Sequence, residues 1–240
     1  MPHSGGQMPR MNRSVAIACL LLGTLVSSCD SSTPPDSTAR QHPVARGASA
    51  SVVNHDWQST AVPFALRLSA AAEARARQRV VYDAAYVRIP YPNGDVAPDR
   101  GVCSDEVVRA YRLLGIDLQR LVHEDMRRAF HEYPKRWGLA RPDPNIDHRR
   151  VPNLATFFAR HGSSLPVSSR GADYKAGDVV TFALADGRPH IGIITQRMSA
   201  DGERPLVMHN IGFGPQIEDM LFSLTITGRF RYAGPTGRTG

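Results

Sequence analysis

Apolar residues in the first part of the folded region recur at the three- to four-residue spacing of amphipathic helices. This spacing predicts helices over residues 64–80, 102–114, 117–133 and 154–161. Glycine follows the second and the fourth of these segments, as is common at the C-terminal end of a helix. Loops rich in Pro and Gly separate the first two helices and precede the last one. This part of the chain is therefore predicted to be helical.

From Ala176 onward the pattern changes to short apolar runs divided by Gly and Pro. These runs predict strands over residues 179–182, 191–195, 206–208 and 225–232. Helices followed by sequential strands favour an α+β domain, in which the helices pack on an antiparallel sheet.

The amino-terminal region has the features of an export signal. Arg10 and Arg13 precede a short apolar run at residues 15–26, which is too short to span a bilayer comfortably. The run ends in Leu-Val-Ser-Ser-Cys at residues 25–29, which resembles the bacterial lipobox. That resemblance implies lipidation of Cys29, and an ordinary secretory peptide with an incidental cysteine is the alternative.

The chain is accordingly divided into four parts. We expect a lipoprotein signal peptide over residues 1–28, a disordered tether over 29–61, one folded domain over 62–234 and a disordered tail over 235–240. The tether is rich in Ser, Thr, Pro, Gly and Ala and has too few large apolar residues to offset the entropy of ordering. The protein is expected to be exported to a bacterial cell envelope, anchored in the membrane through Cys29 and facing the periplasm.

The charge of the chain argues against one class of partner. The formal net charge is +7, and without the two arginines of the signal segment 27 basic residues face 22 acidic ones, a net charge of +5. These basic residues are scattered, whereas nucleic-acid binding requires a clustered basic face with interleaved aromatic residues. We expect no nucleic-acid partner, and a monomer whose mild basicity suits anionic lipid or cell-wall polymer.

The three cysteines differ in their surroundings. Cys19 lies in the apolar core of the signal and Cys29 at its predicted cleavage site, which leaves Cys103 without a disulfide partner in an oxidising compartment. Cys103 also begins a predicted helix, where unpaired N–H groups and the helix dipole favour a thiolate. The sequence therefore predicts a nucleophile with a lowered pKa that iodoacetamide modifies quickly near pH 6.

Two histidines lie at the ends of predicted neighbouring strands. His190 opens one strand and His209 ends the next, so antiparallel pairing brings them to one sheet edge. Each histidine alone also fits a surface or core position. Together with Cys103 they fit a base and its orienting residue, with His209 within hydrogen-bonding distance of His190 and His190 about 4 Å from the sulfur. Asn210 is the alternative orienting residue, because a register shift of one residue exchanges the two.

Four segments in order resemble the NlpC-type cell-wall cysteine peptidases of the papain-like clan. They are Gly-Val-Cys-Ser-Asp at 101–105 before a helix, Ala-Gly-Asp-Val-Val-Thr-Phe at 176–182, Pro-His-Ile-Gly-Ile at 189–193 and Val-Met-His-Asn at 207–210. The resemblance implies a papain-like (NlpC-type) core, with Cys103 as nucleophile, His190 as general base and His209 as the residue that orients it.

A narrower resemblance covers roughly residues 66–232. Tyr-Asp-Ala-Ala-Tyr-Val-Arg at 82–88 and Pro-Asp-Pro-Asn-Ile-Asp-His-Arg-Arg at 142–150 are similar to an uncharacterised bacterial envelope family of the same clan, domain-of-unknown-function family twelve-eighty-seven. The resemblances together imply a thiol hydrolase that cleaves an amide bond of peptidoglycan stem peptides, with cell-wall peptide as its partner. The alternatives are an inactive papain-like module that binds wall peptide or a protein, and an acyltransferase on the same core.

Several polar residues are candidates for substrate contacts. Asp105 departs from the NlpC pattern; it can cap its helix or select a cationic substrate group. The mixed charges of Asp147, His148 and Arg149 suit the carboxylates of a stem peptide, or a surface loop held by its own ion pairs.

The oxyanion of an attacked carbonyl requires hydrogen-bond donors. The backbone N–H of Cys103 is the expected one, with Tyr86 or Tyr91 as a side-chain donor.

A metal site is not expected. His123 and His131 lie eight residues apart on one predicted helix, and neither a His-Glu-x-x-His nor a paired-cysteine motif occurs. We therefore expect no metal and no cofactor.

Overall fold

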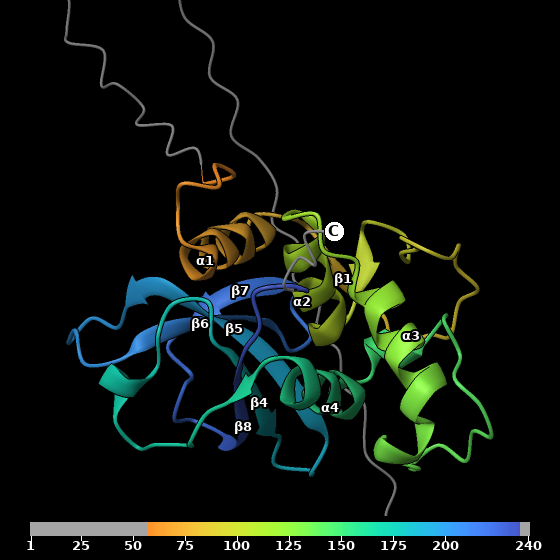
Figure 1. Cartoon of the computed structure of the whole chain (residues 1–240). Coiled ribbons are helices and arrows are strands. Elements are labelled where there is room, and N and C mark those ends of the chain that lie inside the picture. The colour runs from red at the N-terminus through yellow and green to blue at the C-terminus, as the bar shows by residue number, and fades with distance from the viewer. Residues whose placement is uncertain (1–56, 236–240) are drawn as a thin grey trace, which may run out of the picture. The chain divides into compact units, whose positions relative to one another are not determined.

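A computed structural model describes residues 57–235 (Figure 1). The predicted signal peptide, most of the predicted tether with Cys29, and residues 236–240 of the predicted tail lie outside the described residues. Trp57 already packs against the hydrophobic core, ahead of residue 62, where the sequence placed the start of the domain.

Within residues 57–235 the helices lie where the apolar spacing predicts them. The first three are shorter than predicted, and the fourth begins three residues earlier. They are α1 (Phe64–Arg75), α2 (Cys103–Arg112), α3 (Leu118–Ala129) and α4 (Val151–His161), with the 3₁₀ turns η1 (Phe130–Glu132), η2 (Asp147–Arg149) and η3 (Gly171–Asp173). The predicted third helix extends to residue 133 because η1 continues it as a tighter turn. The glycine after α4, Gly162, is required by packing: a Cβ there would lie 2.3 Å from the carbonyl oxygen of Arg231.

The strands form two sheets in the described part of the chain. They are β1 (Val81–Tyr82), β2 (Arg100–Gly101), β3 (Ser163–Ser164), β4 (Val179–Ala183), β5 (Pro189–Met198), β6 (Pro205–Asn210), β7 (Pro215–Glu218) and β8 (Thr225–Arg231). β1 and β2 form a short parallel pair, and the other six form an antiparallel sheet in the order β3-β8-β4-β5-β6-β7. The apolar runs predicted β4, β5, β6 and β8; the short strands β1, β2, β3 and β7 were not predicted.

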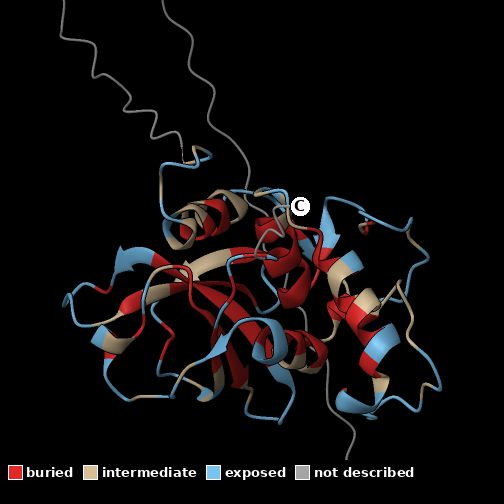
Figure 2. Cartoon of the chain, in the orientation of Figure 1, coloured by how far each residue is buried: buried red, intermediate tan, exposed pale blue. Residues whose placement is uncertain are grey.

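The large sheet separates two groups of buried side chains. Much of its central strands is coloured as buried in Figure 2. Ile191, Ile193 and Met208 belong to the main core with the helices, while Ile194 and Val207 belong to a smaller core on the other side. This division follows the two-residue period of the strands. α1, α2 and α4 pack on the sheet, whereas α3 packs on α2, α4 and η2. The predicted α+β class, with helices packed on an antiparallel sheet, is confirmed.

Candidate active site

The parallel pair β1–β2 delivers the chain to the first residue of α2, which is Cys103. Gly101 has φ +156° and lies against Asp105, whose Oδ2 would be 3.1 Å from an added Cβ. Val102 is the extended residue before the helix, and its N–H donates to Asp105 Oδ2 at 2.7 Å. This cap fixes where α2 begins, and it thereby fixes the position of the thiol.

The thiol of Cys103 is enclosed by the protein. The residue is 4% exposed and packs in the main core together with Ile191 and Ile193 of β5. Burial raises the pKa of Cys103 to about 12, although the backbone N–H groups of Ile191, Ser104 and Cys103 itself act to lower it. The negative charge of Asp105 raises the pKa further. The prediction of a lowered pKa was therefore wrong, because desolvation outweighs the helix terminus.

The alkylation rate of Cys103 should show this raised pKa. Compared with an exposed thiol of pKa 9, the folded protein should react with iodoacetamide at least about a hundredfold more slowly between pH 6 and 8. Because the pKa of Cys103 is raised, its thiolate fraction and the rate of its alkylation should keep increasing as the pH rises toward 12. Intact-mass measurement against pH, with a denatured control, reads this rate. Quick modification near pH 6 would show instead that the resting thiol is ionised.

The two predicted histidines meet in the interior. β5 and β6 are antiparallel, and His190 Nε2 lies 3.0 Å from His209 Nδ1 with the ring planes at 87°. The rings are almost closed from solvent, at 1% and 2% exposure. Asn210 does not make this contact, because the next strand position faces the other way. Its Oδ1 accepts the N–H of Gly212, and its Nδ2 is buried without a partner among the described residues.

Glu218 extends this pair to a third side chain. It ends β7, and its Oε2 lies 2.7 Å from His209 Nε2. Glu218 was not among the predicted site residues, because a short strand after a Gly-rich turn shows too little periodicity to be predicted. The partner of His209 could be found only by knowing that β7 pairs with β6.

The hydrogen bonds assign the protons of both neutral rings. A carboxylate only accepts, so His209 Nε2 carries a proton and donates it to Glu218. His209 Nδ1 is then an acceptor, and His190 Nε2 donates to it. The remaining nitrogen of His190, Nδ1, is left unprotonated and able to accept a proton.

Both imidazoles are neutral near pH 7. Burial, with a further contribution from His209, lowers the pKa of His190 to about 3. Burial also lowers the pKa of His209, and the hydrogen bond to Glu218 acts in the opposite direction. A base of this kind holds a proton only while a neighbouring group stabilises the charge.

The thiol and the histidine pair lie on packed elements: Cys103 begins α2, His190 is near the beginning of β5, and His209 is near the end of β6. Among residues 57–235 no hydrogen bond joins the Cys103 sulfur to the His190 ring; on β5 the sulfur faces the N–H of Ile191, the next residue. The expected separation of about 4 Å between sulfur and ring stays a prediction.

Asp105 is fully engaged inside the protein. Its two oxygens accept hydrogen bonds from Arg149 Nε at 2.8 Å and from Arg149 Nη2 at 3.0 Å, and both side chains are at most 3% exposed. Arg149 also donates to the carbonyl oxygens of Asp83 and Ala85. This ion pair ties η2 and the segment after β1 to the start of α2. Of the two roles considered, Asp105 therefore caps its helix and is not placed to select a substrate cation, and Arg149 is not free to bind a stem peptide.

Asp147 and His148 are buried as well, at 1% and 3% exposure. Asp147 Oδ2 accepts the N–H of Asp143, and burial raises the pKa of Asp147 to about 6. Burial lowers the pKa of His148 to about 3. The expectation that these residues bind substrate carboxylates does not fit this placement, because they form the interior of the loop.

The two tyrosines considered as oxyanion donors lie elsewhere. Tyr86 donates to Asp143 Oδ2 at 3.0 Å, and Tyr91 packs edge-on against His123 with ring centroids 5.0 Å apart. Another tyrosine, Tyr82 of β1, pairs with Gly101, two residues before Cys103. Its pKa is raised by burial and then by the charge of Cys103.

Residues 57–235 contain no group of three or more His, Cys, Asp or Glu side chains placed to hold a metal ion. No helix in this part of the chain combines the length and apolar character needed to span a membrane.

The helices and the antiparallel sheet define an α+β protein. The structure is similar to NlpC2 and NlpC1 from Trichomonas vaginalis, at 15% and 14% identity and TM-scores of 0.44 and 0.43. These matches cover 73% and 75% of this chain and 49% and 48% of the other two, so the chain spans about half their length.

The chain belongs to the family described as domain of unknown function DUF1287, whose model matches residues 69–232. The narrower of the two resemblances seen in the sequence is thereby confirmed. A relative is the uncharacterised protein YijF of Escherichia coli strain K12, which is 49% identical over 188 residues, 75% of this chain and 91% of the relative.

Proposed function

We propose that this protein is a thiol hydrolase that cleaves an amide bond, with peptidoglycan stem peptides as substrate. The observation that carries the proposal is the row Glu218–His209–His190, whose two imidazoles are buried. The row ends at His190, one residue before Ile191, whose backbone N–H faces the Cys103 sulfur. A carboxylate, two oriented imidazoles and a thiol at a helix start make up a nucleophile with its base and orienting groups. The ordered sequence segments that resemble the NlpC peptidases support the same chemistry.

The proposed reaction uses the resting protonation states. His190 Nδ1 takes the proton of the Cys103 thiol as the sulfur attacks the amide carbonyl carbon, and the backbone N–H of Cys103 stabilises the oxyanion. The carbon–nitrogen bond then breaks as His190 returns the proton to the leaving amine, which leaves a thioester on Cys103. Water attacks the thioester, gives a proton to His190, and the thiol reforms with a free carboxylic acid as the second product.

The Glu218 carboxylate has a specific part in this scheme. Imidazolium forms on His190 in a buried site, and its charge is stabilised through His209 by the carboxylate beyond it. Since Cys103, His190 and His209 are nearly closed from solvent, the residues that cover them must move when a substrate enters.

The direct test incubates the protein with purified muropeptides and analyses the products by mass. The proposal expects the gain of one water across one amide bond, and no product with Cys103→Ala. Unchanged muropeptides with active-site thiol intact would count against it.

Removal of the Glu218 charge should reduce turnover without unfolding the domain. In Glu218→Gln the side chain keeps its shape but no longer stabilises the imidazolium, so kcat should fall roughly 10- to 100-fold with little change in KM. The control is Glu203→Gln, an exposed acid on the same part of the chain outside the row. Equal effects of the two variants would remove Glu218 from the mechanism.

A second candidate function is a catalytically inactive module that binds wall peptide. The observation that favours it is the closed, un-ionised thiol, whose pKa burial raises to about 12.

An acyltransferase would use the same residues and differ in the second step, where an amine replaces water. Supplying an acceptor amine separates the two reactions, since transfer adds the mass of the amine to the product.

We also propose that the protein is exported and anchored to the membrane through lipidated Cys29, with the domain facing the periplasm. Cys29→Ser should block processing or release a soluble form, whereas the unaltered protein should partition with membranes. Sequencing of the mature N terminus reads the outcome. An N terminus at a residue other than 29 would contradict the anchor.

A further inference from the structure

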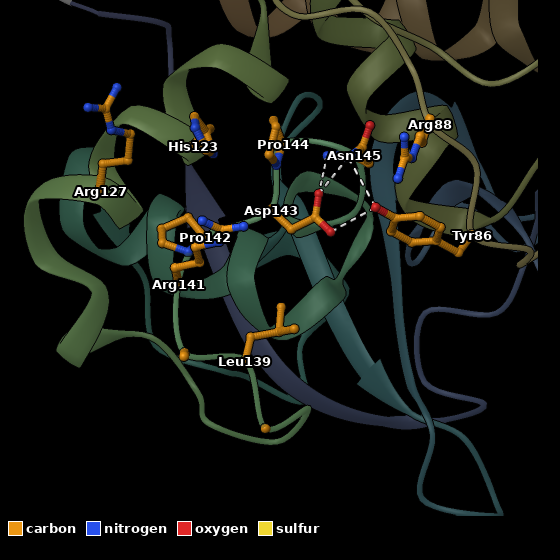
Figure 3. Close-up of a pocket in the computed structure, with 12 residues that line it drawn as sticks. Tyr86, Arg88, His123, Arg127, Leu139, Arg141, Pro142, Asp143, Pro144 and Asn145 are labelled. Atoms are coloured by element: carbon orange, nitrogen blue, oxygen red, sulfur yellow. Dashed lines mark hydrogen bonds between the residues drawn. The ribbon is translucent and has the colours of Figure 1, made fainter.

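A cavity of about 730 Å³ lies between α3 and the loop before η2, within the usual size of a small-molecule site (Figure 3). Its wall carries three arginines from separate parts of the chain, Arg88, Arg127 and Arg141. Within the described residues none of the three guanidinium groups makes an ion pair or a side-chain hydrogen bond. We call this cavity the arginine cavity.

The arginine cavity also contains a hydrogen-bonded carboxylate, Asp143, and a histidine, His123, with one nitrogen that has no partner among the described residues. Asp143 lies between the arginines and accepts hydrogen bonds from Tyr86 and from Asn145. Burial raises the pKa of Asp143, but the N–H of Asn145 and these side-chain bonds outweigh it and keep the pKa below its usual value. His123, which also lines the cavity, has its Nδ1 buried without a partner among the described residues, and burial and the charge of Arg127 lower the pKa of its ring.

The charges of the arginine cavity select the chemistry of its ligand. Three guanidinium groups against one carboxylate leave a positive excess, and guanidinium pairs with carboxylate or phosphate through two parallel hydrogen bonds. Arg127 and Arg88 lie at opposite ends in Figure 3, so the anionic groups are spread along the ligand. The ionised Asp143 between them repels a continuous row of phosphates and suits an amide N–H or an ammonium group.

The arginine cavity is connected to the proposed active site. Tyr82 pairs with Gly101, two residues before Cys103, and Tyr86 lines the cavity. The four intervening steps of extended chain cover at most about 14 Å. Arg149 holds this segment by the carbonyl oxygens of Asp83 and Ala85. One extended peptide can therefore reach both places.

We propose that the arginine cavity binds a peptide that carries two or more carboxylates. The choice of a peptide over a phosphate ligand rests on the proposed function. The positive charge of the cavity and its unpaired guanidinium groups are observed independently of that function. Such a ligand holds its acidic part in the arginine cavity while an amide of the same chain approaches Cys103.

The test measures binding to the full chain carrying Cys103→Ala, so that it does not depend on catalysis. The probes are triglutamate and a peptide of three glutamines with an amidated C terminus, which has the same size and no carboxylate. Triglutamate should bind, and replacing Arg88, Arg127 and Arg141 by Gln should weaken it at least about tenfold. Replacing the exposed Arg77, Arg79 and Arg197 by Gln removes the same charge elsewhere and should change the Kd little.

Each result decides between named alternatives. Equal weakening by both triple variants, or equal binding of both peptides, would overturn the arginine cavity as a carboxylate site. Cavity-dependent binding of inorganic pyrophosphate or of phosphatidylglycerol vesicles that exceeds triglutamate binding would overturn the peptide in favour of a phosphate ligand. If triglutamate binds as expected while muropeptides stay uncleaved by the unaltered protein, the proposed hydrolase fails and the carboxylate site stands.

Discussion

A Cys103→Ala protein is expected to lose amide cleavage by a factor of about a thousand or more and to keep its fold. The change removes the only nucleophile of the proposed mechanism, so no acyl-enzyme can form. It also removes one buried atom, the sulfur, from the start of α2, and this small loss of packing should lower the stability of the domain only slightly. Product formation from muropeptides reads the activity, and thermal unfolding reads the fold.

The matched control is Val108→Ala, a buried position on the same helix. It removes more apolar volume than Cys103→Ala but no reacting group, so it should lower thermal stability and leave most of the turnover. His190→Ala should share the loss of activity, because Cys103 then keeps its proton. Residual activity in Cys103→Ala equal to that of Val108→Ala would exclude the thiol as nucleophile.

An Arg149→Met protein is expected to lose about 3–5 kcal/mol of its free energy of unfolding. Arg149 and Asp105 form a buried ion pair with two hydrogen bonds, and removing one partner leaves the other charge without compensation. The carbonyl oxygens of Asp83 and Ala85 lose their donor at the same time. Urea denaturation, followed by circular dichroism, measures the change.

The double variant Asp105→Asn/Arg149→Met separates charge from packing. The asparagine oxygen can still accept the N–H of Val102, and no buried charge is left, so at least about half of the lost stability should return. Arg120→Met is the control, because its partner Glu124 is exposed and such pairs contribute little. A double variant as unstable as Arg149→Met would show that the pair acts through packing alone.

The periodic parts of the chain could be predicted from the sequence. Helical spacing located the four helices, and apolar runs located four strands of the large sheet, because each of these elements buries one face. β7 has four residues that follow a turn rich in glycine, and it is half-buried, so no period marks it. Because β7 was not predicted, Glu218 was not included in the candidate site, although the pairing of His190 and His209 could be predicted.

The environment of a side chain could not be predicted in the same way. The position of Cys103 at a helix start argues for a lowered pKa, but the sign of the shift depends on how much protein covers the sulfur. Likewise Asp147, His148 and Arg149 have the composition of a surface loop, and they are buried because α2, α3 and α4 close around η2. Such burial results from contacts between segments far apart in the chain.

The central claim is that Cys103 forms a thioester with a peptide acyl group, and mass analysis of the protein during turnover tests it most directly. The protein is mixed with muropeptides, quenched in acid within seconds, digested and searched for acylated Cys103. The proposed mechanism predicts an adduct on Cys103 that an added amine or water removes, and that is absent from Cys103→Ala. Muropeptide binding without any adduct on Cys103, and without any cleaved product, would contradict it.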